Sequence, residues 1–405
     1  FPHLGCLGGG DNYSDSGGNS NLSIKNWLAI LVLAISTFII VTTELAPVGL
    51  LTPMAKDFGV SESQIGVTVT IYAWVGAFSA ILASVFLGNI AKKTLLIVLI
   101  TILLASNTLS ATVTTYSMLL VARVIGALAH GSFWAIIGAT AVAIVPPKHI
   151  GVATSIVFGG VSAASVFGVP LSNYIGIALG WHNAFWLMAI LSAIALVGIL
   201  LLIPRIQSNS AIGIASLKHV FQSATLRKIY LATLIVITAH FAAFTFIEPW
   251  LQMQQLFPST YIPIALFTFG IAGLLGNFIT GFTIDKFLKP TVSISIILMS
   301  STLLYLGLNQ KNLSQITIFT CLVVWGLAVS GIFVGFQTWV LKLADKEVFP
   351  ASAIYVSCFN LAIGLGAILG AWGVAQFPIS QLYLYAGLII AGSILLILLI
   401  PSNNR

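Results

Sequence analysis

Charged residues are scarce in this 405-residue chain: Asp, Glu, Lys and Arg make up 6% of it, against about 25% in soluble domains. That shortage excludes an ordinary soluble protein. Hydrophobic residues make up 59% of the chain, and apolar runs of about twenty residues, the length that spans a bilayer core, recur along nearly all of it. The sequence therefore predicts an all-α, polytopic membrane protein.

Motifs of nucleotide-driven and hydrolytic enzymes are also missing. The chain contains no G-x-x-x-x-G-K-[ST] phosphate loop, no H-E-x-x-H and no G-x-S-x-G, each of which holds reactive groups at a fixed spacing. Energy must therefore come from an ion or substrate gradient, and we expect neither enzyme activity nor a cofactor. The three cysteines, Cys6, Cys321 and Cys358, are far apart and share no metal-ligand spacing, so we interpret them as structural free thiols and expect no metal site.

Gly, Pro and charged residues divide the chain into twelve apolar stretches, six on each side of the longest internal polar stretch. We predict a disordered tail over 1–26, a six-helix bundle over 27–203, a cytoplasmic linker over 204–227 and a second six-helix bundle over 228–400. The predicted membrane-spanning helices cover residues 27–50, 65–88, 94–111, 116–145, 151–178, 184–203, 228–251, 260–283, 291–308, 314–342, 351–376 and 380–400. Two equal sets indicate a pseudo-symmetric protein whose halves rock around a substrate near the midplane.

Basic residues indicate the orientation of these helices. If the N-terminus is cytoplasmic, thirteen of the 16 Lys and Arg residues fall on the cytoplasmic side, while Lys56 and Lys311 fall on the other and Arg123 lies within a helix. Cytoplasmic loops carry this excess in membrane proteins. Both termini are therefore predicted to be cytoplasmic, and the net charge of +7 is a topology signal that argues against a nucleic-acid partner.

Glu44 and Arg123 are the charged residues that a membrane makes most expensive. An ionised side chain near the bilayer centre costs about 2.5 to 3.5 kcal/mol even on lenient scales. Counted from the predicted helix ends, Glu44 lies roughly 9 Å and Arg123 roughly 10 Å below the same surface, so the two share a depth. We expect the pair either to carry a proton through a coupled cycle or to be a static contact that fixes helix packing.

Two histidines and another buried acid are further candidates for the transport pathway. His130 lies almost two turns beyond the arginine, and Trp134 one turn later, so they project from one face of the fourth helix. His240 and Glu248, eight residues apart in the predicted seventh helix, share a broad face. The alternatives are that the histidines are satisfied core residues and that Glu248 reaches water at the outer interface.

Gly168 and Pro170 predict a bent fifth helix that packs closely on a neighbour, because Gly permits close approach and Pro removes an intrahelical hydrogen bond. Asp285, in a cytoplasmic turn with Lys286, is expected to act as a latch and not as a proton carrier. Other polar and aromatic residues inside the spans are candidates for lining a substrate cavity, although about half should serve packing only. They are Tyr72, Trp74, Asn107, Asn173, Gln337 and Asn360.

Several short stretches carry a family resemblance. Residues 42–51 read TTELAPVGLL, 70–74 read TIYAW, and 238–240 (TAH) precede 246–249 (FIEP). Arg123 begins an R-x-x-G pattern, and Gly168 begins G-x-P. With these stretches the chain, over residues 27–400, resembles the major facilitator superfamily, and more narrowly the bacterial sugar-efflux transporters of its drug:proton antiporter group.

This resemblance implies a twelve-helix monomer in the bacterial inner membrane that works by alternating access and exports sugars or sugar-like compounds in exchange for protons. Its partners would be the small-molecule substrate, protons and membrane lipid. The chain departs from the family at one loop, where the usual G-x-x-x-D reads Ser84-x-x-x-Gly88, although Gly281-x-x-x-Asp285 keeps it in the second half. An exporter of amphipathic drugs is the alternative, and a non-transporting membrane sensor or enzyme a remote one.

Overall fold

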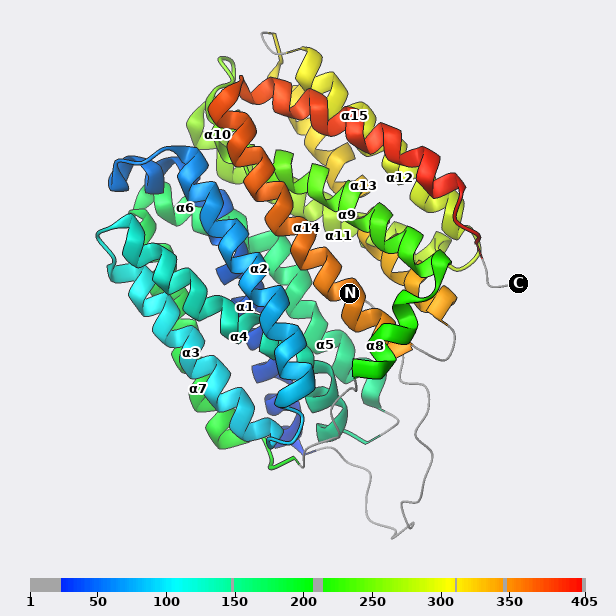
Figure 1. Ribbon diagram of the computed structural model, residues 1–405. Coiled ribbons are helices and arrows are strands. Elements are labelled where there is room, and N and C mark those ends of the chain that lie inside the picture. The colour runs from blue at the N-terminus through cyan, green and yellow to red at the C-terminus, as the bar shows by residue number, and fades with distance from the viewer. Residues whose placement is uncertain (1–22, 147–148, 207–213, 310–311, 345–347, 403–405) are drawn as a thin grey trace.

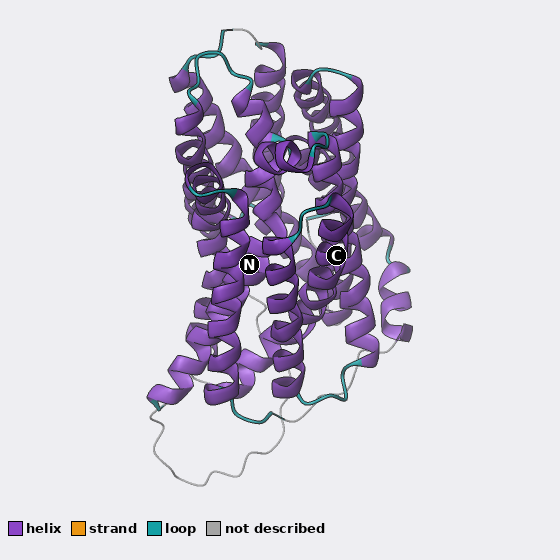
Figure 2. Ribbon diagram, turned by 90° about the vertical axis from the view of Figure 1, so that its left-hand side faces the viewer, coloured by secondary structure: helices purple, strands orange, loops and turns teal. Residues whose placement is uncertain are grey.

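Figures 1 and 2 show the fold, a computed structural model that describes residues 23–146, 149–206, 214–309, 312–344 and 348–402. Those residues contain no strand, and twelve of their helical segments are long and apolar enough to cross a membrane. The prediction of an all-α, polytopic membrane protein with twelve spanning helices is therefore confirmed. Most of the predicted tail, residues 1–22, lies outside the described residues.

The helices follow one another along the chain with short connections. The first half contains α1 (Ile24–Phe58), α2 (Glu62–Phe86), α3 (Lys92–Thr112), α4 (Tyr116–Ile144), α5 (Ile150–Ala163), the π-helical turn η2 (Ala164–Gly168), α6 (Val169–Ala178) and α7 (Trp181–Leu202). After the short α8 (Ile214–Phe221), the second half contains α9 (Ala224–Phe244), α10 (Ile247–Gln252), η3 (Ser259–Tyr261), α11 (Ile262–Thr283), α12 (Leu288–Leu308), α13 (Gln315–Ala344), α14 (Val348–Gln376) and α15 (Ile379–Leu398).

Local chemistry explains where α1 ends and α2 begins. Gly59 has a φ of 66°, in the left-handed region that suits glycine, and its N–H is accepted by the carbonyls of Ala55 and Lys56. Two residues later the Ser61 side chain accepts the backbone N–H of Gln64, whose own side chain accepts the N–H of Ser61. This capping box starts α2 immediately after the turn.

The bundle has two distinct ends. Ile24 at the start of α1, the linker helix α8 and Leu398 at the end of α15 lie at one end, called here the linker end (Figure 1). The Lys289 ammonium at the start of α12 donates to the carbonyls of Leu398 and Ile400 there, at 2.9 and 3.0 Å. The opposite end, called the far end, contains helix α10 and the end of α1 at Phe58.

Helices of the two halves meet mainly from the far end to the middle of the bundle, where α2 runs beside α14 (Figure 1). Cross-half hydrogen bonds run from Ser63 Oγ to the Ala371 carbonyl at 2.7 Å, from Thr70 Oγ1 to that of Gly364 at 2.8 Å, and from Trp74 Nε1 to that of Leu361 at 3.1 Å. Farther toward the linker end of α2, Phe78 is 63% and Phe86 is 69% exposed. These bonds join the halves from the far end to the level of Trp74, whereas Phe78 and Phe86, nearer the linker end of α2, are exposed.

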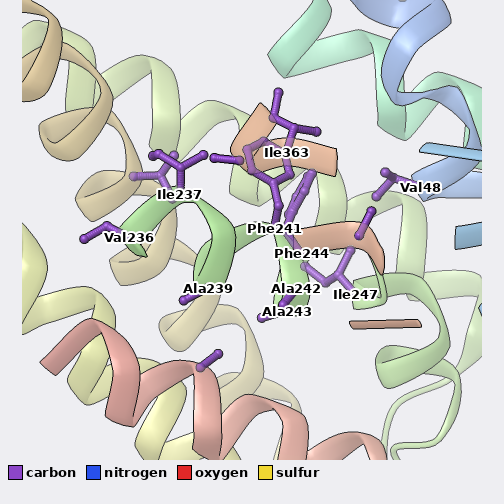
Figure 3. Packing of buried hydrophobic residues seen from close by; sticks show 14 of the residues in the cluster. Val48, Val236, Ile237, Ala239, Phe241, Ala242, Ala243, Phe244, Ile247 and Ile363 are labelled. Atoms are coloured by element: carbon purple, nitrogen blue, oxygen red, sulfur yellow. The ribbon is translucent and has the colours of Figure 1, made fainter. Parts of the chain in front are cut away.

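Apolar packing continues across this junction. One buried cluster lies wholly in the first half, whereas the larger one extends from α1 and α2 into the second half. Figure 3 shows part of the larger cluster, with Val48 of α1 on one side and Ile247, Ile363 and Phe244 of the second half on the other. In a membrane this contact is maintained by close packing, because lipid tails are as apolar as the side chains.

The predicted seventh helix, 228–251, is not continuous. It consists of α9, which ends at Phe244, and the separate α10, with a turn at Thr245 and Phe246 between them. Pro249 lacks the N–H that would bond to the Thr245 carbonyl and its ring crowds that turn, which accounts for the break. His240 and Glu248 therefore belong to two different helices, which corrects the expectation of a shared face.

The predicted fifth helix is also interrupted. Its residues form α5, η2 and α6, with Pro170 as the second residue of α6 after the π-helical turn. A Cβ on Gly168 would lie 2.5 Å from Thr42 Oγ1 of α1, so only glycine allows this approach. Proline removes one intrahelical bond and glycine removes the side chain, and together they place an irregular helix against α1.

Candidate functional site

A buried polar cluster in the first half consists of Glu44 on α1, Tyr72 on α2, and Arg123 and His130 on α4; we call it the Glu44 cluster. The Glu44 side chain is 8% exposed, and its Oε2 lies 3.4 Å from His130 Nε2. The Tyr72 ring packs edge-on against the His130 ring, with centroids 5.3 Å apart. The sequence predicted a similar depth for Glu44 and Arg123 and a shared face for Arg123 and His130, and the structure brings these three residues together with Tyr72.

The Arg123 side chain bonds to the backbone of α1. Its Nη1 donates to the Thr43 carbonyl at 2.7 Å and its Nη2 to the Glu44 carbonyl at 2.9 Å. Pro47 explains the first bond, because a proline has no N–H for the carbonyl four residues earlier. A helix normally hides its carbonyls in its own bonds, so the proline exposes an acceptor inside the membrane, and the guanidinium takes it.

The second proline of α1 also exposes a backbone carbonyl, which a side chain of another helix satisfies. Pro53 leaves the Gly49 carbonyl without its helical donor, and Asn173 Nδ2 of α6 donates to that carbonyl at 2.7 Å. Gly49 also lies against α6, since a Cβ there would be 2.9 Å from the Val169 carbonyl oxygen. Arg123 and Asn173 therefore satisfy the two carbonyls that the prolines of α1 expose.

This arrangement changes the expected partner of the Glu44 carboxylate. The predicted pairing with Arg123 occurs at the backbone, whereas the carboxylate itself faces His130. Within the described part of the chain, Glu44 Oε1, Arg123 Nε and the Tyr72 hydroxyl have no hydrogen-bond partner. The guanidinium also lies over the Tyr72 ring, 4.0 Å from its centroid, a favourable cation–π contact. A carboxylate and an imidazole in contact, with free acceptor capacity, can exchange a proton.

A second buried polar group lies in the other half around His240 of α9. Trp325 Nε1 of α13 donates to His240 Nδ1 at 3.1 Å, which makes Nδ1 the acceptor and leaves the ring proton on Nε2 in the neutral form. The rings of Phe241, Phe244 and Phe333 surround this imidazole, with centroids 4.8 to 5.7 Å from it. We call these five residues the His240 cage; Phe241 and Phe244 are seen in Figure 3.

Most of the predicted cavity residues are engaged in helix packing. Asn107 Nδ2 donates to Thr43 Oγ1 at 3.2 Å, and Asn360 Nδ2 donates to a carbonyl of its own helix at 3.0 Å. Trp134 stacks on Phe158, with centroids 6.2 Å apart. Gln337 is half-buried on α13. Of the four amides proposed for a substrate, three including Asn173 therefore use their NH₂ group elsewhere.

Glu248 lies at the far-end junction between the halves. Its Oε2 accepts the backbone N–H of Thr52 at 3.2 Å and the Thr52 hydroxyl at 2.6 Å, while Gln252 Nε2 donates to Oε1 at 3.3 Å. Glu62 of α2 lies 3.3 Å from the same hydroxyl. Thr52 and Glu62 were missed from sequence; the only signal was an acid at the start of a spanning helix.

The predicted cytoplasmic turn lies at the linker end. Lys342 Nζ of α13 donates to the backbone carbonyl of Asp285 at 3.0 Å, and Lys286 follows directly. Gly281 lies in the last turn of α11, and the turn over residues 284–286 that follows is tied to α13 through its backbone. A latch made by the Asp285 carboxylate remains a prediction.

Two lateral grooves are apolar. One of about 450 Å³ lies between α9, α14 and α15, and one of about 250 Å³ lies between α6 with η2 and α11. Neither is lined by residues of the Glu44 cluster, and their apolar lining is typical of surfaces that lipid tails contact. Among the residues that the structure describes, no group of three His, Cys, Asp or Glu side chains is placed to share a metal ion.

Comparison with known proteins places the fold. The sequence model of the Major Facilitator Superfamily matches residues 32–265 and again 229–405. The human organic anion transporter MFSD10 (TETRAN) has a similar structure, with a TM-score of 0.66 and 15% identity over 92% of this chain and 99% of that one. A bacterial homologue of the human lysosomal transporter Spinster, in an inward-facing and unoccupied conformation, has a TM-score of 0.67 and 14% identity over 93% of this chain and 95% of that one.

Proposed function

Because the chain belongs to the Major Facilitator Superfamily, and is therefore a multi-pass membrane transporter and not an enzyme, we propose that it is a proton-coupled antiporter that exports small sugars or sugar-like metabolites. Its two halves would expose a central substrate site alternately to either side of the membrane. The observation that carries the coupling is the contact between the Glu44 carboxylate and His130 inside the first half.

The chemistry of this contact suits proton coupling. A carboxylate on a side chain that is only 8% exposed within a spanning helix is costly while it is ionised, and a proton removes that cost. Asp57 and Glu62, the other acids of the described spanning segments, lie at or next to helix ends. Glu44 is therefore the acid best placed to bind a proton in one state and release it in the other, with His130 as its partner and Arg123 as the residue that positions α1.

Charge distribution supports an orientation with the linker end in the cytoplasm. The described basic residues at the linker end are Lys25, Lys92, Lys93, Arg205, Lys218, Arg227, Lys228, Lys286, Lys289 and Lys342, whereas Lys56 lies at the far end. Lys148, Lys311, Lys346 and Arg405 fall outside the described residues. We infer that both termini are cytoplasmic in a bacterial inner membrane, that the far end is external, and that the monomer is the working unit.

Two substrate classes compete. Sugars are supported by the resemblance of the sequence and by the half-buried Gln337, but three of the four candidate amides are engaged in packing. The His240 cage instead favours an amphipathic compound, because four aromatic side chains around one imidazole form a largely apolar environment with few hydrogen-bonding groups. An exporter of amphipathic compounds is therefore the second candidate.

Proteoliposomes loaded with labelled pentoses, galactosides or cationic dyes distinguish the two. Proton-driven antiport predicts uphill export of one class that stops when the proton gradient is collapsed. Glu44→Gln should remove that dependence while the protein still inserts, whereas Gln337→Ala should weaken sugar export and leave dye export unchanged. Export that is indifferent to the gradient in the parent protein would refute proton coupling.

A further inference from the structure

Glu248 forms the centre of a polar contact between the halves, which we call the Glu248 joint: Glu248 and Gln252 of α10, Thr52 of α1 and Glu62 of α2. Glu248 is only 1% exposed, although α10 lies beyond the membrane-spanning segment that ends at Phe244. Three donors from the two halves converge on its carboxylate. Such a carboxylate is held in place by both halves at once.

The Thr52 hydroxyl has one hydrogen to donate and lies near two carboxylates, those of Glu248 and Glu62. It lies 2.6 Å from Glu248 Oε2 and 3.3 Å from Glu62 Oε1. If both acids are ionised, the hydroxyl can donate fully to only one of them, and two negative charges share a small region. A proton on Glu248 resolves the conflict, because Oε2 then donates to Thr52 Oγ1 and Thr52 donates onward to Glu62.

Among the described residues around the Glu248 joint, we find no cation that would neutralise the carboxylates of Glu248 and Glu62. Lys56 and Asp57 occupy the last turn of α1; Lys56 is exposed, and Asp57 accepts the indole N–H of Trp181 at 2.9 Å. The neighbouring helices α11, α14 and α15 contain no Asp, Glu, Lys or Arg over their described lengths. Tyr383 of α15, whose ring stacks on Trp250 next to the joint, has a buried hydroxyl without a partner among the described residues.

Electrostatics favour a proton at this joint. Burial raises the pKa of Glu248 to about 7, and the nearby charge of Glu62 acts in the same direction, against the hydrogen bonds from Thr52 and Gln252. Separation of the halves at the far end would return the carboxylate to water, where its ordinary pKa is 4.5. The closed form thus binds the proton more tightly than the open form.

We propose that Glu248 is a second proton-binding site, which holds the far end closed when it carries a proton and releases α10 from α1 when it is ionised. The proposal rests on alternating access, and it gives the external proton a specific action: a proton taken up at the far side closes that side. Glu44 would then be the deeper site and Glu248 the outer one.

Linkage sets the size and direction of the effect. The stability of the closed form relative to the open form increases as the pH falls through about 7. It stops increasing below about 4.5, where the open form also binds the proton. Between pH 8 and pH 5.5 the ratio of closed to open molecules should rise roughly 30-fold.

Double electron–electron resonance on the full chain in lipid nanodiscs tests this without substrate or gradient. Spin labels on Thr114, in the loop between α3 and α4, and on Gln255, after α10, would report the far-end separation, with all three cysteines replaced by serine. Glu248→Gln should hold the short distance at every pH, since its amide replaces the protonated acid. A Glu248→Gln protein that still changes with pH as the parent does would overturn the proposal.

Two further variants keep the test decisive if Glu248→Gln folds poorly. Glu62→Gln removes the like charge and should move the transition to lower pH, whereas Thr52→Val removes a hydrogen bond to the ionised acid and should move it to higher pH. Shifts in the same direction would contradict the joint. Glu44→Gln should keep the part of the pH response that depends on Glu248, so adding Glu248→Gln to it should abolish that part. Loss of the whole response in Glu44→Gln alone would assign it to Glu44 instead, and because no transport is measured, a failure of the export proposal leaves this result intact.

Discussion

Replacing Pro47 by Ala should recover part of the stability that is lost when Arg123 is replaced by Ala. Arg123 makes two charge-assisted bonds to the Thr43 and Glu44 carbonyls, each typically about 1.5 to 3 kcal/mol, so Arg123→Ala should cost about 3 to 6 kcal/mol. About 1 to 3 kcal/mol of that loss is the penalty of leaving the buried Thr43 carbonyl without a donor. An alanine in place of Pro47 would supply an N–H to the same carbonyl and remove that penalty.

A proline-to-alanine change also stabilises a helix for reasons unrelated to Arg123, by up to about 3 kcal/mol. The informative quantity is therefore the coupling: Pro47→Ala should stabilise the Arg123→Ala protein by about 1 to 3 kcal/mol more than it stabilises the parent. Pro53→Ala is the matched control, because it restores a donor to the Gly49 carbonyl, which Asn173 uses. It should couple to Asn173→Ala by about 1 kcal/mol and not to Arg123→Ala.

Reversible unfolding in mixed micelles with increasing sodium dodecyl sulfate, followed by tryptophan fluorescence, gives the free energies for both cycles. If Arg123→Ala is too unstable to purify, Arg123→Gln keeps one donor and should show a smaller coupling of the same sign. Equal effects of Pro47→Ala with and without Arg123, or equal coupling of Pro53→Ala to both positions, would refute the assignment of each side chain to its own carbonyl.

Three other expectations concern the two buried groups and the far-end contact. Glu44→Gln should abolish proton-driven export in proteoliposomes without reducing the amount of inserted protein, and a parent-like export rate would exclude Glu44 from coupling. Trp325→Phe removes the N–H that His240 accepts and should lower the unfolding free energy by about 1 kcal/mol, measured in the same micelles; no loss would mean that the bond adds nothing. Gly66→Leu would place a side chain where the Phe246 ring lies, 2.6 Å from the position of a Cβ, so the short far-end distance in the resonance experiment should be depleted, and an unchanged distribution would contradict the close approach.

Part of the candidate site could be predicted from the sequence and part could not. The similar depth predicted for Glu44 and Arg123 follows from counting residues along apolar runs, and the Arg123 guanidinium does reach the Glu44 carbonyl. Which atom of α1 the guanidinium contacts depends on how α1 and α4 are rotated about their axes, which the spacing of residues in either helix does not specify. Pro47 was a usable signal, since a proline inside a buried helix always leaves one carbonyl in need of a donor.

The break between α9 and α10 shows the same limit. The sequence stays apolar through residue 251, which predicts one continuous helix. In the structure the helix breaks one turn before Pro249, and Glu248 lies in the separate α10 at the far-end junction. Neither Thr52 nor Glu62 stands out along the chain, because their importance comes from an acid that is 186 residues away from Glu62 and 196 residues away from Thr52.

The sequence by itself determined that this protein is a bundle of twelve membrane-spanning helices, because the cost of burying charge and of leaving backbone groups unpaired in lipid acts on each segment separately. Only the tertiary structure decided that Glu44 faces His130, that Arg123 and Asn173 satisfy the carbonyls exposed by two prolines, and that Glu248 joins the halves. Those partners come from different helices, and the axial rotation and close packing that bring them together are properties of the assembled bundle.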